Sequence, residues 1–141
     1  SPDFIILEGW CVGAIAQTSS ELKRPVNHLE EVEDPLGIWR SFVNTELAGD
    51  YQTLFDKIDY RIMLKAPSFD CVYQWRLEQE HKLAQKALKD SDGVMSDEEV
   101  ANFVQHYQRI TEHALCHLPE KCDTVFYLDE TRTITKQDVK R

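Results

Sequence analysis

The sequence lacks the features that mark membrane-spanning, secreted and nucleic-acid-binding proteins. No apolar stretch approaches the roughly 20 residues that a membrane helix needs, and no secretory signal opens the sequence. The four cysteines are too scattered to indicate a disulfide framework. With 16 basic against 25 acidic residues and a net charge of -9, the chain is poorly suited to DNA or anionic lipid. We therefore expect a soluble, cytoplasmic chain with reduced thiols and no nucleic-acid or membrane partner.

Glycine is also scarce, and its placement excludes one common nucleotide-binding motif. A phosphate loop of the form G-x-x-x-x-G-K-[ST] holds phosphates with its backbone N–H groups and its lysine. None of the five glycines precedes a Lys-Ser or Lys-Thr pair at that spacing; they are Gly9, Gly13, Gly37, Gly49 and Gly93. The sequence therefore contains no phosphate loop of this form.

What the sequence does contain is enough for one domain with a packed core. Its 141 residues are 42% hydrophobic and 29% charged, which is ordinary for a folded protein. Continuous apolar runs rich in β-formers predict strands, and apolar residues at helical spacing predict helices. Ser68 can cap one helix, and Ser96 with Glu99 forms a capping box for another. The expected order is a strand at 3–7, helices within 26–31 and 36–55, a strand at 60–65, helices at 69–88 and 97–115, and a strand at 124–128.

This alternation of strands and helices predicts an α/β domain with a mostly parallel sheet. Three strands make a poor parallel sheet, because both of its faces need cover and both of its edges need protection. We therefore expect the sheet to be incomplete.

The opening stretch FIILEGWCVG, residues 4–13, runs four bulky apolar residues directly into Glu8. Ligands of open parallel sheets bind beyond the carboxyl ends of the strands, so a carboxylate there can hold a metal ion or a water. Four apolar residues followed by an acid are also typical of the second nucleotide-binding signature of P-loop kinases, whose acid serves the magnesium of the nucleotide. The alternative is a strand that ends in a solvated acid.

Five separated blocks follow one another between residues 3 and 129: ILEGWCVGA, RPVNHLEEVEDPLGIWRSFVNTELAGDYQTLF, LKAPSFDCVYQWRLEQE, FVQHYQRIT and VFYLD. Together they resemble the D-glycerate 3-kinase-like branch of the P-loop kinases, to which uridine kinase, pantothenate kinase and phosphoribulokinase are more distantly related. The resemblance implies a P-loop NTPase-type parallel sheet with helices on both faces and a helical lid at about residues 67–121. Because no phosphate loop is present, residues 1–141 are expected to be the C-terminal part of one such domain, with about three strands.

The same resemblance implies an ATP-dependent kinase that uses Mg²⁺ to phosphorylate a hydroxyl of a small, glycerate-like substrate. Without a phosphate loop, the chain alone is expected to be inactive. In these kinases the strand of the phosphate loop lies between the first two strands expected here. A missing N-terminal half, a swapped segment or a second chain is therefore the expected partner. The alternative is a non-catalytic, acidic α/β interaction module that keeps a kinase-like shape.

The residue types and the resemblance together suggest a set of site residues. Glu8 is the expected carboxylate, which either holds magnesium or accepts the proton of the substrate hydroxyl. Two lid cations, Arg76 and Arg109, are the expected phosphate contacts and, with Glu8, the expected catalytic residues. The remaining assignments are Arg40, Asn44, Trp10 and Tyr107 for the substrate, and Lys65 and Leu128 for the nucleotide.

Each assignment competes with a structural role. Arg40 and Asn44 lie four residues apart on one helix, where Arg40 can grip a carboxylate or lie at the surface. Arg76 has two glutamates within four residues, which suits an ordinary ion-pair face. Trp10 and Tyr107 can equally be core residues.

Two further stretches come close to metal-binding motifs. LKDSDGVMSDEE nearly matches a calcium loop through Asp90, Asp92, Gly93 and Glu99, but Leu88 at its first position cannot ligate and Glu99 belongs to the capping box. HALCHLPEKC clusters His113, Cys116, His117 and Cys122, yet their spacing fits no standard zinc pattern. From the sequence we expect neither ion at these stretches.

Overall fold

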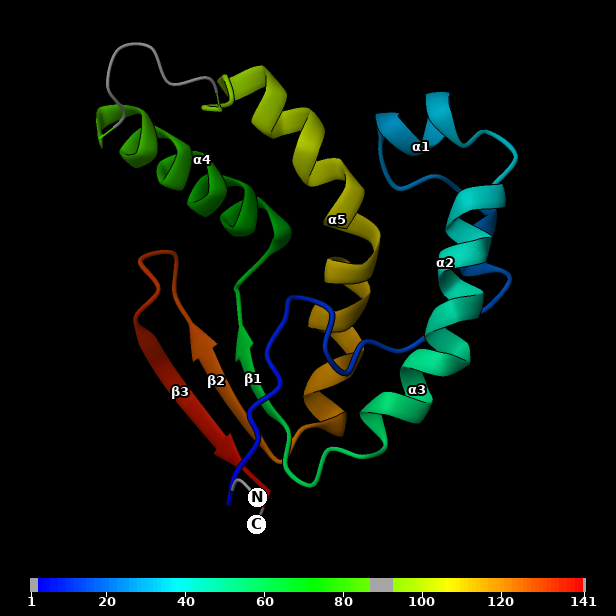
Figure 1. Cartoon of the computed structure of the whole chain (residues 1–141), viewed down its shortest axis with the longest axis vertical. Helices are drawn as coiled ribbons and strands as arrows, with labels where there is room; N and C mark the ends of the chain where they lie inside the picture. Colours follow the sequence, from blue (N-terminus) through cyan, green and yellow to red (C-terminus); the bar gives the residue numbers. More distant parts are fainter. Residues whose placement is uncertain (1–2, 87–92, 141) are drawn as a thin grey trace.

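The computed structural model describes residues 3–86 and 93–140 and shows an α/β domain with a three-stranded sheet (Figure 1). The expected fold class is confirmed, and the expected helices form with bounds that differ by a few residues. In chain order the elements are η1 Glu21–Lys23, α1 His28–Glu33, α2 Ile38–Ala48, α3 Asp50–Phe55, β1 Ile62–Lys65, α4 Phe69–Lys86, α5 Asp97–His117, η2 Leu118–Lys121, β2 Thr124–Leu128 and β3 Ile134–Val139.

The sheet is mixed rather than mostly parallel, and its order is β1-β2-β3. β1 and β2 run parallel with Met63 opposite Val125, whereas β2 and β3 run antiparallel. Met63 and Val125 form the core together with Ala114 of α5 and Leu118 of η2. The core therefore lies between the two parallel strands and the C-terminal end of α5.

The outer strand β3 is not predicted by the sequence, because ITKQDV has no apolar face and most of its residues are exposed. It becomes a strand through its antiparallel bonds to β2. Asp129 fixes the turn between them, since its carboxylate accepts bonds from the amides of Thr131 (2.8 Å) and Thr133 (2.9 Å). The charges of Lys136 and Asp138 discourage further strand pairing at this edge.

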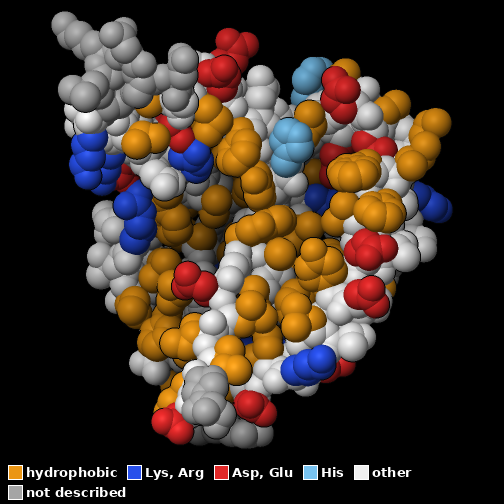
Figure 2. Space-filling view, viewed as in Figure 1, with side chains coloured by type: hydrophobic (Ala, Val, Ile, Leu, Met, Phe, Trp, Pro, Cys, Tyr) orange, Lys and Arg blue, Asp and Glu red, His pale blue; other side chains and the backbone are white. Residues whose placement is uncertain are grey.

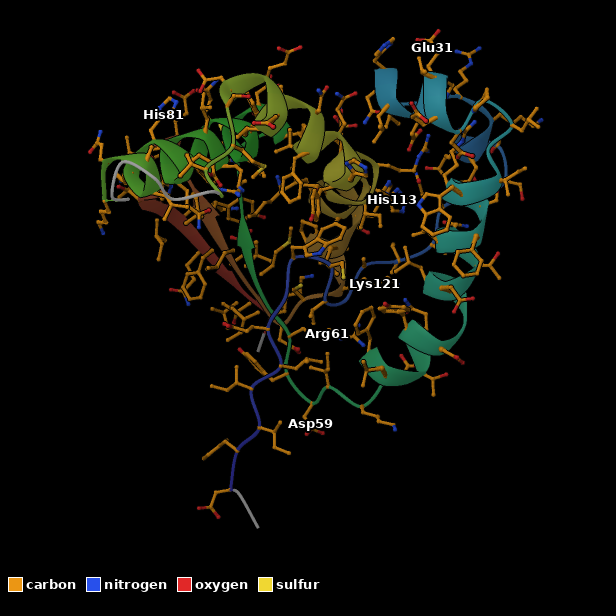
Figure 3. All side chains as sticks on the ribbon, turned by 45° about the horizontal axis from the view of Figure 1, so that its top comes forward. Glu31, Asp59, Arg61, His81, His113 and Lys121 are labelled. Atoms are coloured by element: carbon orange, nitrogen blue, oxygen red, sulfur yellow. The ribbon has the colours of Figure 1, made fainter. Side chains whose placement is uncertain are left out.

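The prediction of a strand at residues 3–7 is wrong, because this segment pairs with no described strand. Figures 1 and 3 show it rising in the same direction as β1, from beyond the amino end of that strand to the side away from β2. Its side chains Phe4, Ile5 and Ile6 are 85% to 90% exposed. A strand forms only where its N–H and C=O groups find ladder partners, and β1 provides none to this segment.

Hydrophobic side chains are also exposed on the adjoining edge of the sheet. Ile62 and Leu64 of β1 are 61% and 65% exposed, on the face opposite the core. Figure 2 shows hydrophobic side chains gathered over the middle and lower part of one face of the molecule. Contiguous apolar surface on a folded protein commonly marks a site of association. The expected cover by helices on both faces of the sheet is therefore incomplete in the described residues.

Local sequence signals explain where the two long helices begin. The Ser96 hydroxyl accepts a bond from the Glu99 amide (3.3 Å), and the Glu99 carboxylate accepts one from the Ser96 amide (2.8 Å), which confirms the capping box. α4 begins directly after Ser68, whose hydroxyl accepts a bond from the Cys71 amide (3.3 Å). Each cap satisfies amide groups that the first turn of a helix leaves without partners.

Some expectations fall on residues outside the described ranges. These are the helix end expected at Leu88 and the calcium-loop positions Leu88, Asp90 and Asp92. The four cysteines are all described, and all are unpaired thiols. Within the described ranges, no helix combines the length and the apolar character needed to cross a membrane.

Candidate active site

Glu8 lies at the end of the exposed N-terminal segment and is itself exposed. The chain turns immediately afterwards, where the Val12 amide donates to the Gly9 carbonyl (3.3 Å) and the Ala14 amide to the Cys11 carbonyl (2.9 Å). In Figure 1 this turn lies near the level of the carboxyl end of β1, from which the chain continues to α4. Among the described residues, none forms a hydrogen bond or ion pair with the Glu8 carboxylate. It can therefore accept a cation or the proton of a hydroxyl.

An aromatic cluster connects this turn to both long helices. The rings of Trp10 and Tyr107 meet edge to face, with 4.9 Å between their centroids. Tyr107 also contacts Phe103, at 5.0 Å, and the Arg76 guanidinium lies 5.6 Å from the centroid of the Phe103 ring. Tyr107 is partly buried in this cluster, whereas Trp10 keeps about half of its surface exposed. The structure thus brings Trp10, Tyr107 and Arg76 together, and their roles toward a ligand remain predictions.

Arg76 has a structural partner as well as access to solvent. It forms an ion pair with Glu80, one turn further along α4, and Glu80 is buried. Both line an open groove of about 750 Å³ along α4. The cationic side chains that line this groove are Arg76, Lys82, Lys86 and Arg132. Glu78 and Glu80 line the same groove and pair with Arg76, Lys82 and Arg132, so the ion-pair face that competes with a phosphate role for Arg76 is present.

Sequence reasoning missed Arg132, because its position depends on the unexpected strand β3. Arg132 lies in the turn before β3 with φ at 66°, a left-handed conformation that a hairpin turn imposes. Its guanidinium pairs with Glu78 of α4 and lies 5.4 Å from the centroid of the Trp75 ring. The one available signal is the turn sequence DETRT between two runs rich in β-formers.

Lys65 and Leu128 lie at the carboxyl ends of the two parallel strands. The Lys65 ammonium is 5.9 Å from the centroid of the Tyr127 ring. Leu128 is half-buried at the irregular position of the β2–β3 register, opposite Ile134. Ligands of parallel sheets bind at this edge, so both residues keep their assignment to the nucleotide as a prediction.

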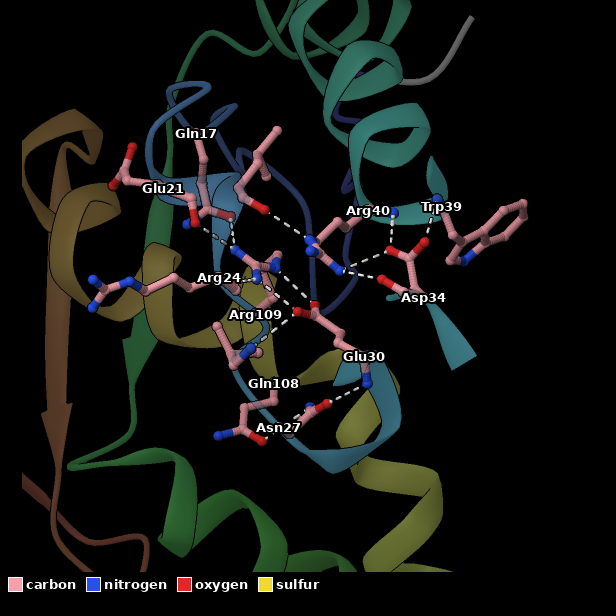
Figure 4. A network of polar contacts seen from close by, with 12 residues as sticks. Gln17, Glu21, Arg24, Asn27, Glu30, Asp34, Trp39, Arg40, Gln108 and Arg109 are labelled. Carbon is pink, nitrogen blue, oxygen red and sulfur yellow. Dashed lines mark hydrogen bonds and ion pairs between the residues drawn. The ribbon is translucent and has the colours of Figure 1, made fainter. Parts of the chain in front are cut away.

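Arg109 is enclosed by the protein and ties α5 to the irregular N-terminal region (Figure 4). Its Nε and Nη2 donate to the two carboxylate oxygens of Glu30, at 2.7 and 2.6 Å. Its remaining N–H groups donate to the carbonyls of Arg24 (2.6 Å) and Glu21 (3.2 Å) and to the side-chain oxygen of Gln17 (3.2 Å). All five guanidinium N–H groups are therefore used within the chain. This arrangement leaves no donor for a phosphate and favours a structural role for Arg109.

Arg40 and Asn44 likewise cross-link α2 to the preceding segment. Arg40 is buried rather than at the surface; its Nη1 lies 3.1 Å from Asp34 Oδ2, and its Nε donates to the Leu22 carbonyl (2.7 Å). The Asn44 side chain exchanges two hydrogen bonds with the Gln17 backbone, at 2.7 and 3.0 Å. These contacts engage the groups with which the two residues were expected to bind substrate, so the substrate assignment gains no support from the structure.

The two carboxylates of this network, Glu30 and Asp34, are held in their charged forms. Burial raises the pKa of Glu30, but hydrogen bonds from Arg109 and from the Val26 amide, with the charge of Arg109, lower that pKa by more. Burial also raises the pKa of Asp34, and bonds from two backbone amides of α2 outweigh this effect. Both pKa values therefore lie below their ordinary range.

We expect acid to destabilise the fold through these two groups. A carboxyl with a lowered pKa stabilises the folded chain above its unfolded pKa and loses that contribution as the pH falls through the folded pKa. The free energy of unfolding should therefore decrease once the pH drops below about 4.5, the ordinary pKa of glutamate. Urea titrations at about pH 7, 5, 4 and 3 measure this decline. The decline of the unfolding free energy with falling pH should be shallower for Arg109→Ala than for the unaltered chain. If the two slopes are equal, the assignment of the decline to Glu30 is wrong.

The fold does not bring the two histidines and two cysteines near the end of α5 into one cluster. Cys122 packs in the hydrophobic core, and Cys116 is an exposed thiol. His113 and His117 stack one turn apart, with ring centroids 4.4 Å from each other. The pKa of His113 is lowered, first by burial and then by the neighbouring His117, against an opposing effect of Glu21.

This chain contains residues that fit only part of a binding site for a complex of Mg²⁺ and a nucleotide. Magnesium in such complexes takes one or two carboxylates together with phosphate oxygens, and the unpaired Glu8 fits that need. Lys65 can contribute positive charge at the carboxyl end of β1. The sequence contains no phosphate loop, however, so these residues fit the metal and the charge of the phosphates but do not form a backbone cradle.

Comparison with known proteins supports the resemblance in both sequence and fold. No family model matches the chain. The "uncharacterized kinase mug58" of Schizosaccharomyces pombe is 42% identical over 106 residues, which are 74% of this chain and 35% of that protein. The D-glycerate 3-kinase of Cryptococcus neoformans var. grubii superposes with a TM-score of 0.68 at 23% identity, over 93% of this chain and 48% of that one. The YGR205w protein superposes with a TM-score of 0.59 at 20% identity, over 92% and 45% of the two chains.

The chain thus spans about a third of the curated relative and about half of each solved structure. The solved structures establish the fold, and the curated relative adds sequence similarity to a kinase. The resemblance to the D-glycerate 3-kinase-like kinases is confirmed: this chain is similar in sequence to part of a kinase and has the fold of about half of a D-glycerate 3-kinase.

Proposed function

We propose that this chain is the C-terminal, lid-bearing part of an ATP- and Mg²⁺-dependent kinase that phosphorylates a hydroxyl of a small, glycerate-like acid. The observation that carries the proposal is the fold shared with D-glycerate 3-kinase over 93% of the chain, at a TM-score of 0.68. The 42% identity to a kinase over 106 residues supports the same chemistry. The proposed setting is the cytoplasm.

The proposed roles follow from the demands of phosphoryl transfer, which needs positioned cations, a carboxylate and exclusion of water. Glu8 holds the magnesium or accepts the hydroxyl proton. Arg76, with a quarter of its side chain exposed, contacts the phosphates when the lid of α4 and α5 closes. Trp10 borders the substrate, and Arg109 positions α5. The phosphate cradle comes from polypeptide outside this chain.

The isolated chain should show no ATP turnover above background. The physical reason is the missing cradle: without backbone N–H groups and a lysine around the β- and γ-phosphates, nothing positions the group that is transferred. The measurement is ADP release with Mg²⁺-ATP, with and without D-glycerate, on protein whose folding is verified by circular dichroism. Robust glycerate-dependent ADP release from the isolated chain would overturn this expectation.

A chimera tests the function itself. Residues 1–141 replace the structurally matching part of the Cryptococcus neoformans D-glycerate 3-kinase, whose remaining chain then supplies the missing half of the domain. We expect glycerate-dependent ADP formation that requires Mg²⁺. A chimera that folds, as judged by a cooperative thermal transition, but shows no glycerate-dependent turnover contradicts the proposal.

The second candidate is a non-catalytic interaction module. The exposed apolar side chains of Phe4, Ile5 and Ile6 and those of Ile62 and Leu64 favour it, since exposed apolar surface suits association with another polypeptide. The same surface is also needed by a kinase part that docks on its other half. The chimera distinguishes the two candidate functions, because only the kinase hypothesis predicts turnover.

A further inference from the structure

Three side chains that are distant in the sequence meet where η1 packs near the C-terminal part of α5. They are Glu21, His113 and His117, and one donor atom from each lies within 4.8 Å of the others. We propose that this cluster, the Glu21–His113–His117 site, binds one divalent transition-metal ion of the zinc type. The site is independent of the proposed kinase chemistry.

The two histidines are placed for chelation by the helix itself. His113 and His117 are four residues apart on α5, so their side chains share one face of the helix. Their ring centroids are 4.4 Å apart. Two histidines at this spacing on one helix are a known arrangement for holding zinc.

Within residues 3–86 and 93–140, the His113 side chain has no hydrogen-bond partner although it is largely enclosed. Its side chain is only 9% exposed, and its Nε2 is buried without a partner. Its Nδ1 lies 3.8 Å from Glu21 Oε1, which is too long for a hydrogen bond. Buried polar atoms are nearly always paired in folded proteins. The unpaired Nε2 marks an imidazole that the fold leaves without hydrogen bonds, and Nδ1, the nitrogen nearest to Glu21, is the atom that a metal ion between His113, Glu21 and His117 would bind.

Glu21 is held in an orientation that leaves one oxygen for the metal. Its Oε2 accepts hydrogen bonds from the Thr18 amide (2.7 Å) and the Thr18 hydroxyl (2.6 Å). Its Oε1 is the oxygen nearest to His113. Bonds of this kind to the second oxygen are how proteins orient carboxylate ligands of metals.

The donor set selects the class of ion. Two imidazoles and one carboxylate suit zinc and its neighbours, whereas calcium and magnesium prefer oxygen ligands alone. Ligand atoms about 2.0–2.1 Å from a tetrahedral zinc lie roughly 3.3 Å apart, so the donors must move together slightly. The exposed side chain of His117 can rotate to close this gap, while Glu21 keeps its orientation. A fourth position remains open to water.

The test uses the full chain without a histidine tag, titrated with ZnCl₂ in a calorimeter and with Co²⁺ in an absorption spectrometer. We expect one ion per chain and a zinc-dependent rise in the melting temperature, because the ion binds the folded state and joins η1 to α5. Both His117→Ala and Glu21→Gln should weaken zinc binding by on the order of 100-fold. These positions are exposed, so the variants should fold.

Two matched controls keep the result specific. His81→Ala removes an exposed histidine whose partner is the single carboxylate of Asp97, and Cys116→Ser removes the nearest exposed thiol; neither should change zinc affinity. The Co²⁺ complex should lack the near-ultraviolet charge-transfer band of thiolate ligands. The proposal is overturned by no stoichiometric binding, by unchanged affinity in His117→Ala or Glu21→Gln, or by loss of binding in Cys116→Ser.

Discussion

Replacing Arg109 by alanine should lower the free energy of unfolding by about 3–5 kcal/mol, the usual cost of breaking a buried ion pair by removal of one partner. The side chains of Arg109 and Glu30 are only 8% and 13% exposed, so the change leaves a carboxylate charge enclosed without its cation. It also removes the donors that reach the carbonyls of Arg24 and Glu21. Urea unfolding at neutral pH, followed by tryptophan fluorescence, measures the loss.

Arg24→Ala is the matched control, because it removes the same charge from an exposed side chain nearby. Its effect should stay within about 0.5 kcal/mol. The double variant Glu30→Leu/Arg109→Met should recover a large part of the stability, since it removes the unpaired charge together with its partner. A single variant Arg109→Ala as stable as Arg24→Ala would show that the network in Figure 4 does not hold α5.

In the chimera described above, Glu8→Gln should lower the turnover number by about 10²–10⁴-fold. Glutamine keeps the size of the side chain but can neither accept the hydroxyl proton nor hold Mg²⁺ with a full negative charge. The measurement is glycerate-dependent ADP release at saturating substrates. If Glu8 serves the metal, high Mg²⁺ should restore part of the rate; if it serves as the base, added Mg²⁺ should have no effect.

The control for this variant is Glu31→Gln, which removes one negative charge from an exposed position of α1. Its turnover should match that of the unaltered chimera. If Glu8→Gln retains turnover within about threefold of that value while the fold is intact, the role assigned to Glu8 is wrong.

The helices could be read from the sequence because their signals are local. The Ser96–Glu99 box, the Ser68 cap and the apolar spacing along α5 each act within one or two turns, so a short stretch of chain carries the whole signal. β1 and β2 were predicted for the same reason, as continuous runs of apolar, β-forming residues. The resemblance to a kinase also rests on sequence alone.

The pairing of the strands and the burial of the charged side chains could not be predicted from local signals. Phe4 to Leu7 have the composition of a strand and form none, whereas the polar residues of β3 form one, because pairing depends on which neighbour is within reach. Arg109 looks like an exposed helical cation until α5 packs against residues 17–30, which lie 79 or more positions away. The meeting of Glu21 with His113 and His117 has the same origin.

The sequence by itself therefore determined the helices, two of the three strands and the kinase resemblance, through contacts between residues that are close along the chain. Only the tertiary structure decided which arginines are enclosed, whether Glu8 finds a partner among the described residues, and where histidines gather. Those outcomes depend on the desolvation and pairing of groups from distant segments, for which the order of residues contains no local signal.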